Sequence, residues 1–151
     1  MSRWRPPREI SVKAIGLLWR AGRLLAAGVR DDAGQLTGVR PLGGSVAFGE
    51  TAEEAVVREF REELGLAVTP SGPPMILQNI FAHEGAPGHE IVFVFSLSYA
   101  ESDLLSAAGL AFVEDDGPAV VADWYDLEDL DRPGGIPLFP AGLMGLLPGT
   151  M

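Results

Sequence analysis

The sequence predicts an α/β domain in which a mixed β-sheet carries a helix on each side. Three observations predict this class. Segments rich in valine, isoleucine, leucine and phenylalanine recur along the chain, residues 51–64 carry helix start and stop signals, and many of the 19 glycines and 12 prolines fall between these segments. A chain of 151 residues fits one domain, so we expect 1–151 to form it, with 1–9 as a loose N-terminal arm.

The expected elements follow one another with turn signals between them. Residues 89–99 form the strongest strand because they are largely β-branched or aromatic, which suits a central strand buried on both faces. The expected order is strands at 11–19, 24–29, 39–42, 75–83, 89–99 and 120–125; turns or loops at 21–22, 31–34, 70–74 and 84–88; an irregular acidic stretch at 101–118; a turn or short helix at 127–130; and a short C-terminal helix at 140–147.

The helix expected at 51–64 has signals at both ends. Thr51 followed by Glu54 is a capping-box pattern, in which the hydroxyl and the carboxylate each accept from an unpaired backbone N–H. Gly65 suits the left-handed position that ends a helix. At about 100° per residue, the apolar side chains Val56 and Phe60 project to a different face from the carboxylates. One face of this helix can therefore pack on the sheet.

The other face brings three carboxylates together, those of Glu59, Glu62 and Glu63. Like charges at this spacing destabilise a helix, so something should compensate for them. Arg58 can pair with Glu54 or Glu62, at i−4 and i+4. A divalent cation would compensate more, because Mg²⁺ prefers carboxylate and water oxygens. The alternative is a charged helix face that is simply solvated.

Glycines and charged residues recur at fixed intervals around this helix. They are Gly44, Glu50, Arg58, Glu59, Glu62, Glu63 and Gly65, with Phe60 and Leu66 at two apolar positions. The stretch from Gly44 to Leu66 resembles a complete Nudix box, G-x5-E-x7-R-E-U-x-E-E-x-G-U, where U is a bulky apolar residue. The glycine loop before the helix also weighs against a merely solvated face, because free backbone groups there can serve a phosphate or metal site.

The resemblance extends beyond the box to a bacterial subgroup with R-P-L-G-G and G-H-E-I-V-F stretches, here Arg40–Gly44 and Gly88–Phe93. It implies the Nudix fold, an α/β/α sandwich with a mixed β-sheet. It also implies a divalent-metal-dependent hydrolase that cleaves a phosphoanhydride bond in a nucleoside diphosphate linked to another group, such as an NTP or an NDP-sugar. Many members read P-G-G where this chain has Leu42 before its two glycines, so we expect the backbone to approach the metal differently.

The resemblance implies roles for the box residues, with Mg²⁺ or Mn²⁺ as the cofactor. Glu59 and Glu63 would be the principal metal ligands, and Glu62 a third ligand or the holder of a water on the metal. Arg58 would orient a glutamate through a charge-assisted pair. Which carboxylate acts as the general base stays open. Glu50 would either support the metal ligands without touching the metal or bind a further metal. The implied catalytic set is Arg58, Glu59, Glu62 and Glu63, and the implied metal-binding set is Gly44 (through its carbonyl), Glu50, Glu59, Glu62 and Glu63.

Three residues outside the box are candidates for binding the substrate. Arg40 lies beside the glycine loop, as a phosphate or base contact or else as a surface charge. His89 and Glu90 open the strongest strand, and because side chains alternate along a strand, only one of them should face the site. Glu90 could be an additional metal ligand or base, and His89 a phosphate contact. The alternative for that pair is a set of local hydrogen bonds. The aromatic residues Trp19, Phe81 and Trp124 could stack on a base or pack in the core.

Composition limits the partners and the location. A net charge of −10 argues against a protein that follows a long nucleic-acid backbone, but metal ions can still neutralise a small nucleotide in an acidic site. The absence of cysteine excludes disulfides and thiolate zinc sites. No apolar run reaches the roughly 18 residues of a membrane span, and residues 1–10 lack the apolar region of a signal peptide. We expect a cytoplasmic protein that binds no membrane.

Two alternatives to a nucleotide hydrolase of this kind remain. One is a Nudix domain that senses a nucleotide without cleaving it, although such domains typically have eroded box glutamates. The other is an RNA 5′-end pyrophosphohydrolase, which the acidic charge disfavours for long RNA but not for a dinucleotide-like end. Family members are frequently dimers, so a homodimer is a further expectation of the resemblance.

Overall fold

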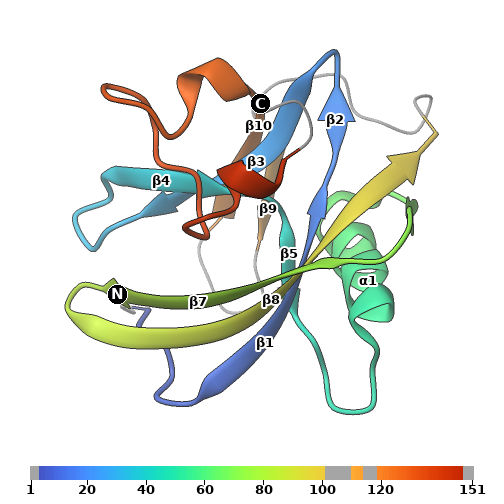
Figure 1. The fold of residues 1–151 in the computed structure, drawn as a ribbon, viewed down its shortest axis with the longest axis horizontal. Helices are drawn as coiled ribbons and strands as arrows, with labels where there is room; N and C mark the ends of the chain where they lie inside the picture. The colour runs from blue at the N-terminus through green and yellow to red at the C-terminus, as the bar shows by residue number, and fades with distance from the viewer. Residues whose placement is uncertain (1–3, 101–109, 114–118, 148–151) are drawn as a thin grey trace.

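A computed structural model describes residues 4–100, 110–113 and 119–147 of the chain (Figure 1). Within these residues, ten strands form two five-stranded sheets, and one α-helix lies against the first sheet. The first sheet is mixed, because one of its strand pairs is parallel and the others are antiparallel. The second sheet is antiparallel throughout. The predicted α/β class with a mixed sheet is confirmed.

The first sheet is built around a long central strand, β8, as the composition of that segment predicts. Its parallel neighbour is β1 on one side, while β7 and β6 pair with successive parts of its other side. The short strand β5 pairs with the outer edge of β1 and leads into the helix. The bounds are β1 Ile10–Leu17, β5 Gly43–Ser45, β6 Val68–Pro70, β7 Met75–His83 and β8 Ala86–Tyr99.

The second sheet continues from the first, since β2 follows β1 after a single residue. A turn at Ala21 and Gly22, both with positive φ, reverses the chain into β3 as predicted. Strand β10 pairs with one side of β3, and β4 and β2 pair with the other. The bounds are β2 Trp19–Arg20, β3 Arg23–Arg30, β4 Leu36–Arg40, β9 Leu110–Val113 and β10 Ala119–Asp126.

The helix α1 spans Ala52–Leu64 and ends where the sequence predicts. Thr51 accepts from the backbone N–H of Glu54 at 3.1 Å, and the Glu54 carboxylate accepts from the backbone N–H of Thr51 at 2.9 Å. Gly65 closes the helix with a left-handed φ of 65°. These local hydrogen bonds fix where the helix begins and ends, and the packing of Val56 and Phe60 in the core sets the direction of its acidic face.

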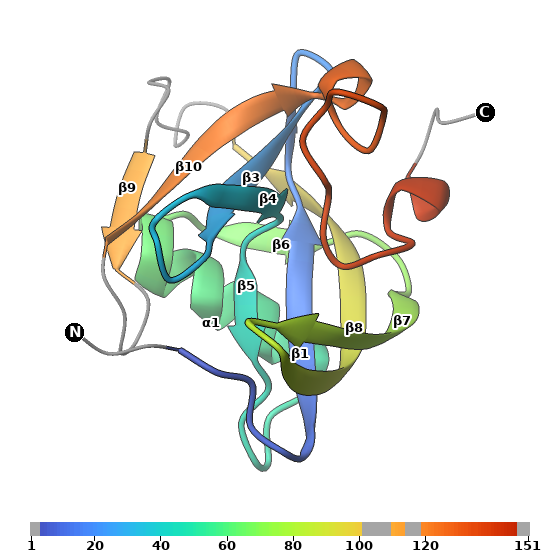
Figure 2. The ribbon, with the colours of Figure 1, turned by 90° about the vertical axis from the view of Figure 1, so that its left-hand side faces the viewer.

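Alternate residues of β1 and β3 point to opposite sides, and this alternation builds two cores. Figure 2 shows the elements that cover them: α1 lies behind β1 and β5, and the C-terminal segment lies in front. Ala14 belongs to the core under α1, whereas its neighbour Ile15 belongs to the core on the other side. Val56 and Phe60 of α1 close the first core. The second core is closed by leucines of the C-terminal segment: Leu130, Leu138, Leu143 and Leu147.

Some expected elements differ in the structure. Among the described residues the layer opposite α1 contains no second α-helix: the helix expected at 140–147 is a short 3-10 turn, Met144–Leu146, preceded by prolines and glycines that interrupt helices. The turn expected at 127–130 is a 3-10 turn at Leu127–Asp129. The irregular stretch expected at 101–118 contains strand β9 at 110–113, and its other residues lie outside the described ones. Strands β5 and β6 were not predicted.

The N-terminal arm lies outside the sheets, and its described residues contact the rest of the domain. Arg5 donates to both carboxylate oxygens of Asp32, and the ring of Trp4 meets that of His83 with centroids 5.3 Å apart. Pro6 is buried. Among the described residues, no helix is long and apolar enough to cross a membrane.

Candidate active site

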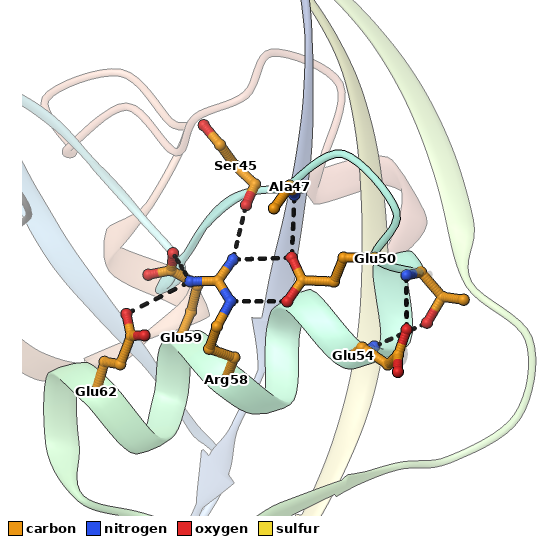
Figure 3. Close-up of polar contacts among 8 residues, drawn as sticks. Ser45, Ala47, Glu50, Glu54, Arg58, Glu59 and Glu62 are labelled. Carbon is orange, nitrogen blue, oxygen red and sulfur yellow. Dashed lines mark hydrogen bonds and ion pairs between the residues drawn. The ribbon is translucent and has the colours of Figure 1, made fainter.

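Arg58 is the centre of the polar contacts in the box (Figure 3). Its Nε and Nη2 donate to the two carboxylate oxygens of Glu50, at 2.7 and 2.9 Å. Its Nη1 donates to Oε1 of Glu59 at 2.9 Å and, more weakly, to Oε2 of Glu62 at 3.4 Å. Nη2 also donates to the backbone carbonyl of Ser45 at 3.0 Å. The Arg58 guanidinium therefore joins the loop before the helix, at Ser45 and Glu50, to two carboxylates on the helix itself.

Of the two partners expected for Arg58, the structure provides one. Glu62 contacts it at i+4, but Glu54 is engaged in the capping box at the helix start. The stronger partner is Glu50, which lies before the helix and was not expected to pair with Arg58. This pair fixes the loop from Ser45 to Glu50 against the helix, because a bidentate arginine–carboxylate contact defines orientation as well as distance.

Hydrogen bonding keeps this pair charged. The Arg58 guanidinium, together with the backbone N–H of Ala47, lowers the pKa of Glu50 from its usual 4.5 to about 2. The pKa of Arg58 is raised, chiefly by its hydrogen bond with Glu50 and also by that with Glu59. At neutral pH the loop therefore carries a fixed carboxylate that balances the arginine, and the helix carboxylates remain to attract a cation.

The structure explains why position 44 is a glycine. Gly44 lies directly against the side chain of Glu59, and a methyl group at position 44 would overlap the Glu59 carboxylate. Glu59 is only 6% exposed, so its carboxylate is held between the helix and β5. Gly44 and Glu59, the first candidate metal ligand on the helix, are therefore in contact, although 15 positions separate them in sequence.

The acidic face of α1 fits a hard divalent cation in the kind of donor it offers. Glu59 is buried, Glu62 has a side chain that is 51% exposed, and Glu63 is partly buried with one carboxylate oxygen fully covered. Carboxylate oxygens are the ligands that Mg²⁺ prefers. Across the described ranges, no three acidic or histidine side chains already converge on one point, since Arg58 holds the carboxylates of Glu59 and Glu62.

A cavity of about 300 Å³ lies on the other side of the first sheet, away from α1. Arg40 and Glu90, two of the predicted substrate-binding residues, line it. Glu90 is 7% exposed, and it accepts a hydrogen bond from Nδ2 of Asn79 at 3.3 Å. Other lining residues come from the N-terminal arm, β3, β4, β7 and the segment 139–141. The cavity is therefore assembled from six separate parts of the chain.

The structure does not place His89 with Glu90. His89 lies on the opposite face of β8, in register with Ile10 and Ile80, and it does not line the cavity. The alternation of side chains thus places one member of the pair in the cavity. Of the aromatic candidates, Trp19 and Trp124 pack against the two cores. Phe81 instead lines the cavity.

Asn79 and Trp4 are among the cavity residues that were not singled out from the sequence. For Asn79 a signal existed, because a two-residue hairpin at Glu84 and Gly85 places it opposite Glu90. The loop expected from the sequence, at 84–88, is longer and would have paired the two strands in a different register. For Trp4 no local signal existed, since its position depends on a contact between Arg5 and Asp32, 27 residues apart.

Lys13, the chain's single lysine, lies between the two regions. It is in register with Val92, which lines the cavity, and with Ser45, whose carbonyl accepts from Arg58. The Lys13 ammonium donates to the Ser45 hydroxyl at 2.9 Å. Because residues in register across a sheet share a face, Lys13 places a positive charge beside the cavity and next to the box loop.

Comparison with known proteins agrees with this geometry. The NUDIX domain family model matches residues 7–142. A MutT NUDIX hydrolase from Burkholderia pseudomallei is similar, with 26% identity, 83% of this chain and 90% of that chain covered, and a TM-score of 0.54. A NUDIX hydrolase from Nitrosomonas europaea shares the fold, with 20% identity, 80% and 74% coverage and a TM-score of 0.52.

A comparison with curated proteins gave no significant match. The family model nevertheless covers most of the chain, including the whole box and the strands on both sides of it. The complete box, its fixed arginine–carboxylate contacts and, in the described part of the chain, the curled sheets with one α-helix agree with that match. The chain therefore belongs to the Nudix family of pyrophosphohydrolases.

Proposed function

We propose that this protein hydrolyses a phosphoanhydride bond in a nucleoside diphosphate linked to another group, such as a further phosphate or a sugar. The observation that carries the proposal is the contact between Arg58 and its carboxylates, which positions the acidic face of α1 against Gly44. A charged face that was merely solvated would not need a glycine beneath a buried Glu59. The geometry supports a face prepared for a cation.

Mg²⁺ or Mn²⁺ would be held by Glu59, Glu62 and Glu63, with the Gly44 carbonyl beside them. When bound, the cation supplies Lewis-acid stabilisation of the phosphate charge. Arg58 acts on the carboxylates: it holds Glu59 in place and keeps Glu50 close to the loop. Glu50 is consequently a positioning residue more than a direct ligand, because both of its oxygens accept from Arg58.

The substrate would extend from the acidic face of α1 toward the cavity. Arg40, Glu90 and Asn79 in the cavity offer polar contacts to the nucleoside end. Lys13 offers a positive charge to the phosphates between them, since it lies next to the Ser45 loop and in register with Val92. His89, on the opposite face of β8, takes no part in this arrangement.

The test is release of nucleotide and phosphate from a panel of NTPs, NDP-sugars, dinucleoside polyphosphates and a triphosphorylated oligoribonucleotide, with Mg²⁺ or Mn²⁺. Glu63→Gln should lower kcat by about three orders of magnitude or more while the fold is retained, because it removes a metal ligand without changing the side-chain shape. Glu53→Gln is the matched control, since Glu53 is an exposed glutamate in the first turn of the same helix.

The outcomes separate the proposal from its alternatives. Metal-dependent turnover of a small nucleotide that is lost only in Glu63→Gln supports it. Nucleotide binding without turnover across the panel would indicate a sensing domain. Turnover confined to the oligoribonucleotide would indicate RNA 5′-end processing. Equal activity of Glu63→Gln and Glu53→Gln would refute the assignment of the metal ligands.

A further inference from the structure

The cavity beside Glu90 has aromatic walls. Trp4, Phe81 and Phe139 line it, and they come from the N-terminal arm, from β7 and from the C-terminal segment. Its volume of about 300 Å³ is at the lower end for small-molecule sites, so it fits one part of a nucleotide better than a whole one. Aromatic side chains around a space of this size are suited to a flat ring, because bases stack on them.

Trp4 is the most accessible of these walls. It is 56% exposed, and its ring meets that of His83 at 60°, so the two rings do not stack flat on each other. The arm is fixed at the next residue: Arg5 donates to both oxygens of Asp32, at 3.0 and 2.6 Å, and to the carbonyl of Trp4 at 2.8 Å. A side chain that lines a cavity and keeps half of its surface exposed is available to a ligand.

The polar groups of the cavity define the kind of ring edge that fits. Glu90 is a buried acceptor, and the Asn79 amide nitrogen points to it, which leaves the Asn79 carbonyl oxygen as a second acceptor. Arg40 adds a donor. A matching ligand therefore presents donors to Glu90 and Asn79 and an acceptor to Arg40. Guanine has that combination, with its N1–H and N2 amino donors beside the O6 acceptor.

We propose that this cavity is the nucleobase site, that Trp4 stacks on the base, and that Glu90 selects a guanine-type edge. The proposal rests on the proposed function, because it identifies the nucleoside of that substrate. It gives the N-terminal arm a role in specificity. Glu90 then acts in recognition, separately from the carboxylates of α1.

The test measures binding of products by calorimetry, so that it needs no turnover. The full chain is titrated with GMP, IMP and ribose 5-phosphate without added metal. IMP lacks the 2-amino group, and a site built to bond that group should bind IMP at least tenfold more weakly than GMP. Ribose 5-phosphate should bind more weakly still, because it lacks the ring. Equal affinities for all three would overturn the proposal.

Variants assign the effect to named side chains. Trp4→Ala should weaken GMP binding about tenfold and leave ribose 5-phosphate unchanged, whereas Trp4→Phe should keep most of the affinity. Ile76→Ala is the matched control, since Ile76 is 57% exposed on β7 and does not line the cavity. Glu90→Gln should remove most of the preference for GMP over IMP. A Trp4→Ala protein with the affinity of Ile76→Ala would overturn the stacking role.

Failure of this inference can be told apart from failure of the proposed function. If nucleotides are hydrolysed with dependence on Glu63 but GMP binds no better than ribose 5-phosphate, the hydrolase stands and the base site does not. If GMP binds as expected but no nucleotide is cleaved, the base site stands alone. If Glu90→Gln lowers kcat equally for GTP and ATP without changing GMP binding, Glu90 acts in phosphate chemistry and the proposed selection is wrong.

Discussion

The box and the cavity lie on opposite sides of one sheet and are built in different ways. The box residues come from one continuous stretch, Gly44–Leu66, and their contacts are within a loop and a helix. The cavity draws on six parts of the chain between Trp4 and Ala141. Chemistry that is common to a family can be encoded locally, whereas the part that distinguishes substrates depends on the whole fold. Changes in the box should therefore affect turnover, and changes near the cavity should affect substrate affinity.

Among changes outside the proposed metal ligands, the largest effect is expected from Arg58→Met. It removes the partner of Glu59, whose side chain is only 8% exposed, and a buried acceptor without its bond costs about 2 kcal/mol. The carboxylates also lose their alignment, so kcat/KM should fall roughly 100-fold, as when residues that orient metal ligands are removed. Denaturant unfolding and steady-state kinetics measure the two losses. Arg61→Met, an exposed arginine on the same helix, should change neither by much.

The Arg58–Glu50 pair also predicts a pH signature in the metal-free protein. The pKa of Glu50 is lowered in the folded state to about 2 from its usual 4.5. Stabilisation by this pair is therefore complete above about pH 4.5 and is lost as the pH falls toward 2. The difference in Tm between wild type and Arg58→Met should shrink over that range. A difference that stays constant from pH 6 to pH 3 would contradict the assignment.

How well the sequence predicts each region depends on how far apart along the chain its contacting residues lie. Thr51, Glu54 and Gly65 act on backbone groups within a few residues, and the helix they bound was predicted at both ends. Gly44 was placed in the box by its spacing, but the reason for it, the carboxylate of Glu59 above it, required the pairing of β5 with β1. Trp4 could not be placed at all, because Asp32 positions its neighbour.

The same argument covers the elements that were missed. Strand β9 is only four residues long and depends on pairing with β10, which its own composition does not reveal. The layer opposite α1 was expected to be a helix. It is instead an irregular segment whose leucines reach the second core while its prolines and glycines prevent a regular element. The segment still covers the second core, because its leucines are buried there, although it does not form the expected helix.

A smaller effect, mainly on turnover, is expected from Gly44→Ala. The new methyl group would displace the Glu59 carboxylate, and a misplacement of about 1 Å in a catalytic group costs up to roughly 100-fold in rate. Stability should fall less than in Arg58→Met, because the displaced atoms are the end of one side chain and Arg58 keeps both of its bonds to Glu50. Gly145→Ala is the matched control, since nothing lies near that position. A Gly44→Ala enzyme with wild-type kcat would show that Glu59 does not need its present position.

The smallest effect is expected from Lys13→Met, which lies between the two regions. Lys13 neighbours Ser45 in the box loop and Val92 in the cavity, so its charge should contact the phosphates that join the two ends of the substrate. We expect KM to rise about tenfold, which corresponds to about 1.4 kcal/mol, while kcat is unchanged. Lys13→Arg should keep most of the affinity, because it retains the charge.

Ionic strength distinguishes a phosphate contact from a structural role for Lys13. An attraction between exposed charges is screened by salt, so the KM values of wild type and Lys13→Met should converge as salt is raised. A loss of the Ser45 contact alone would give a difference in KM that does not depend on salt. If instead Lys13→Met lowers kcat and leaves KM unchanged, then Lys13 acts with the box residues in turnover. The expectation that only the box affects turnover and only the cavity side affects affinity would then be wrong at this residue.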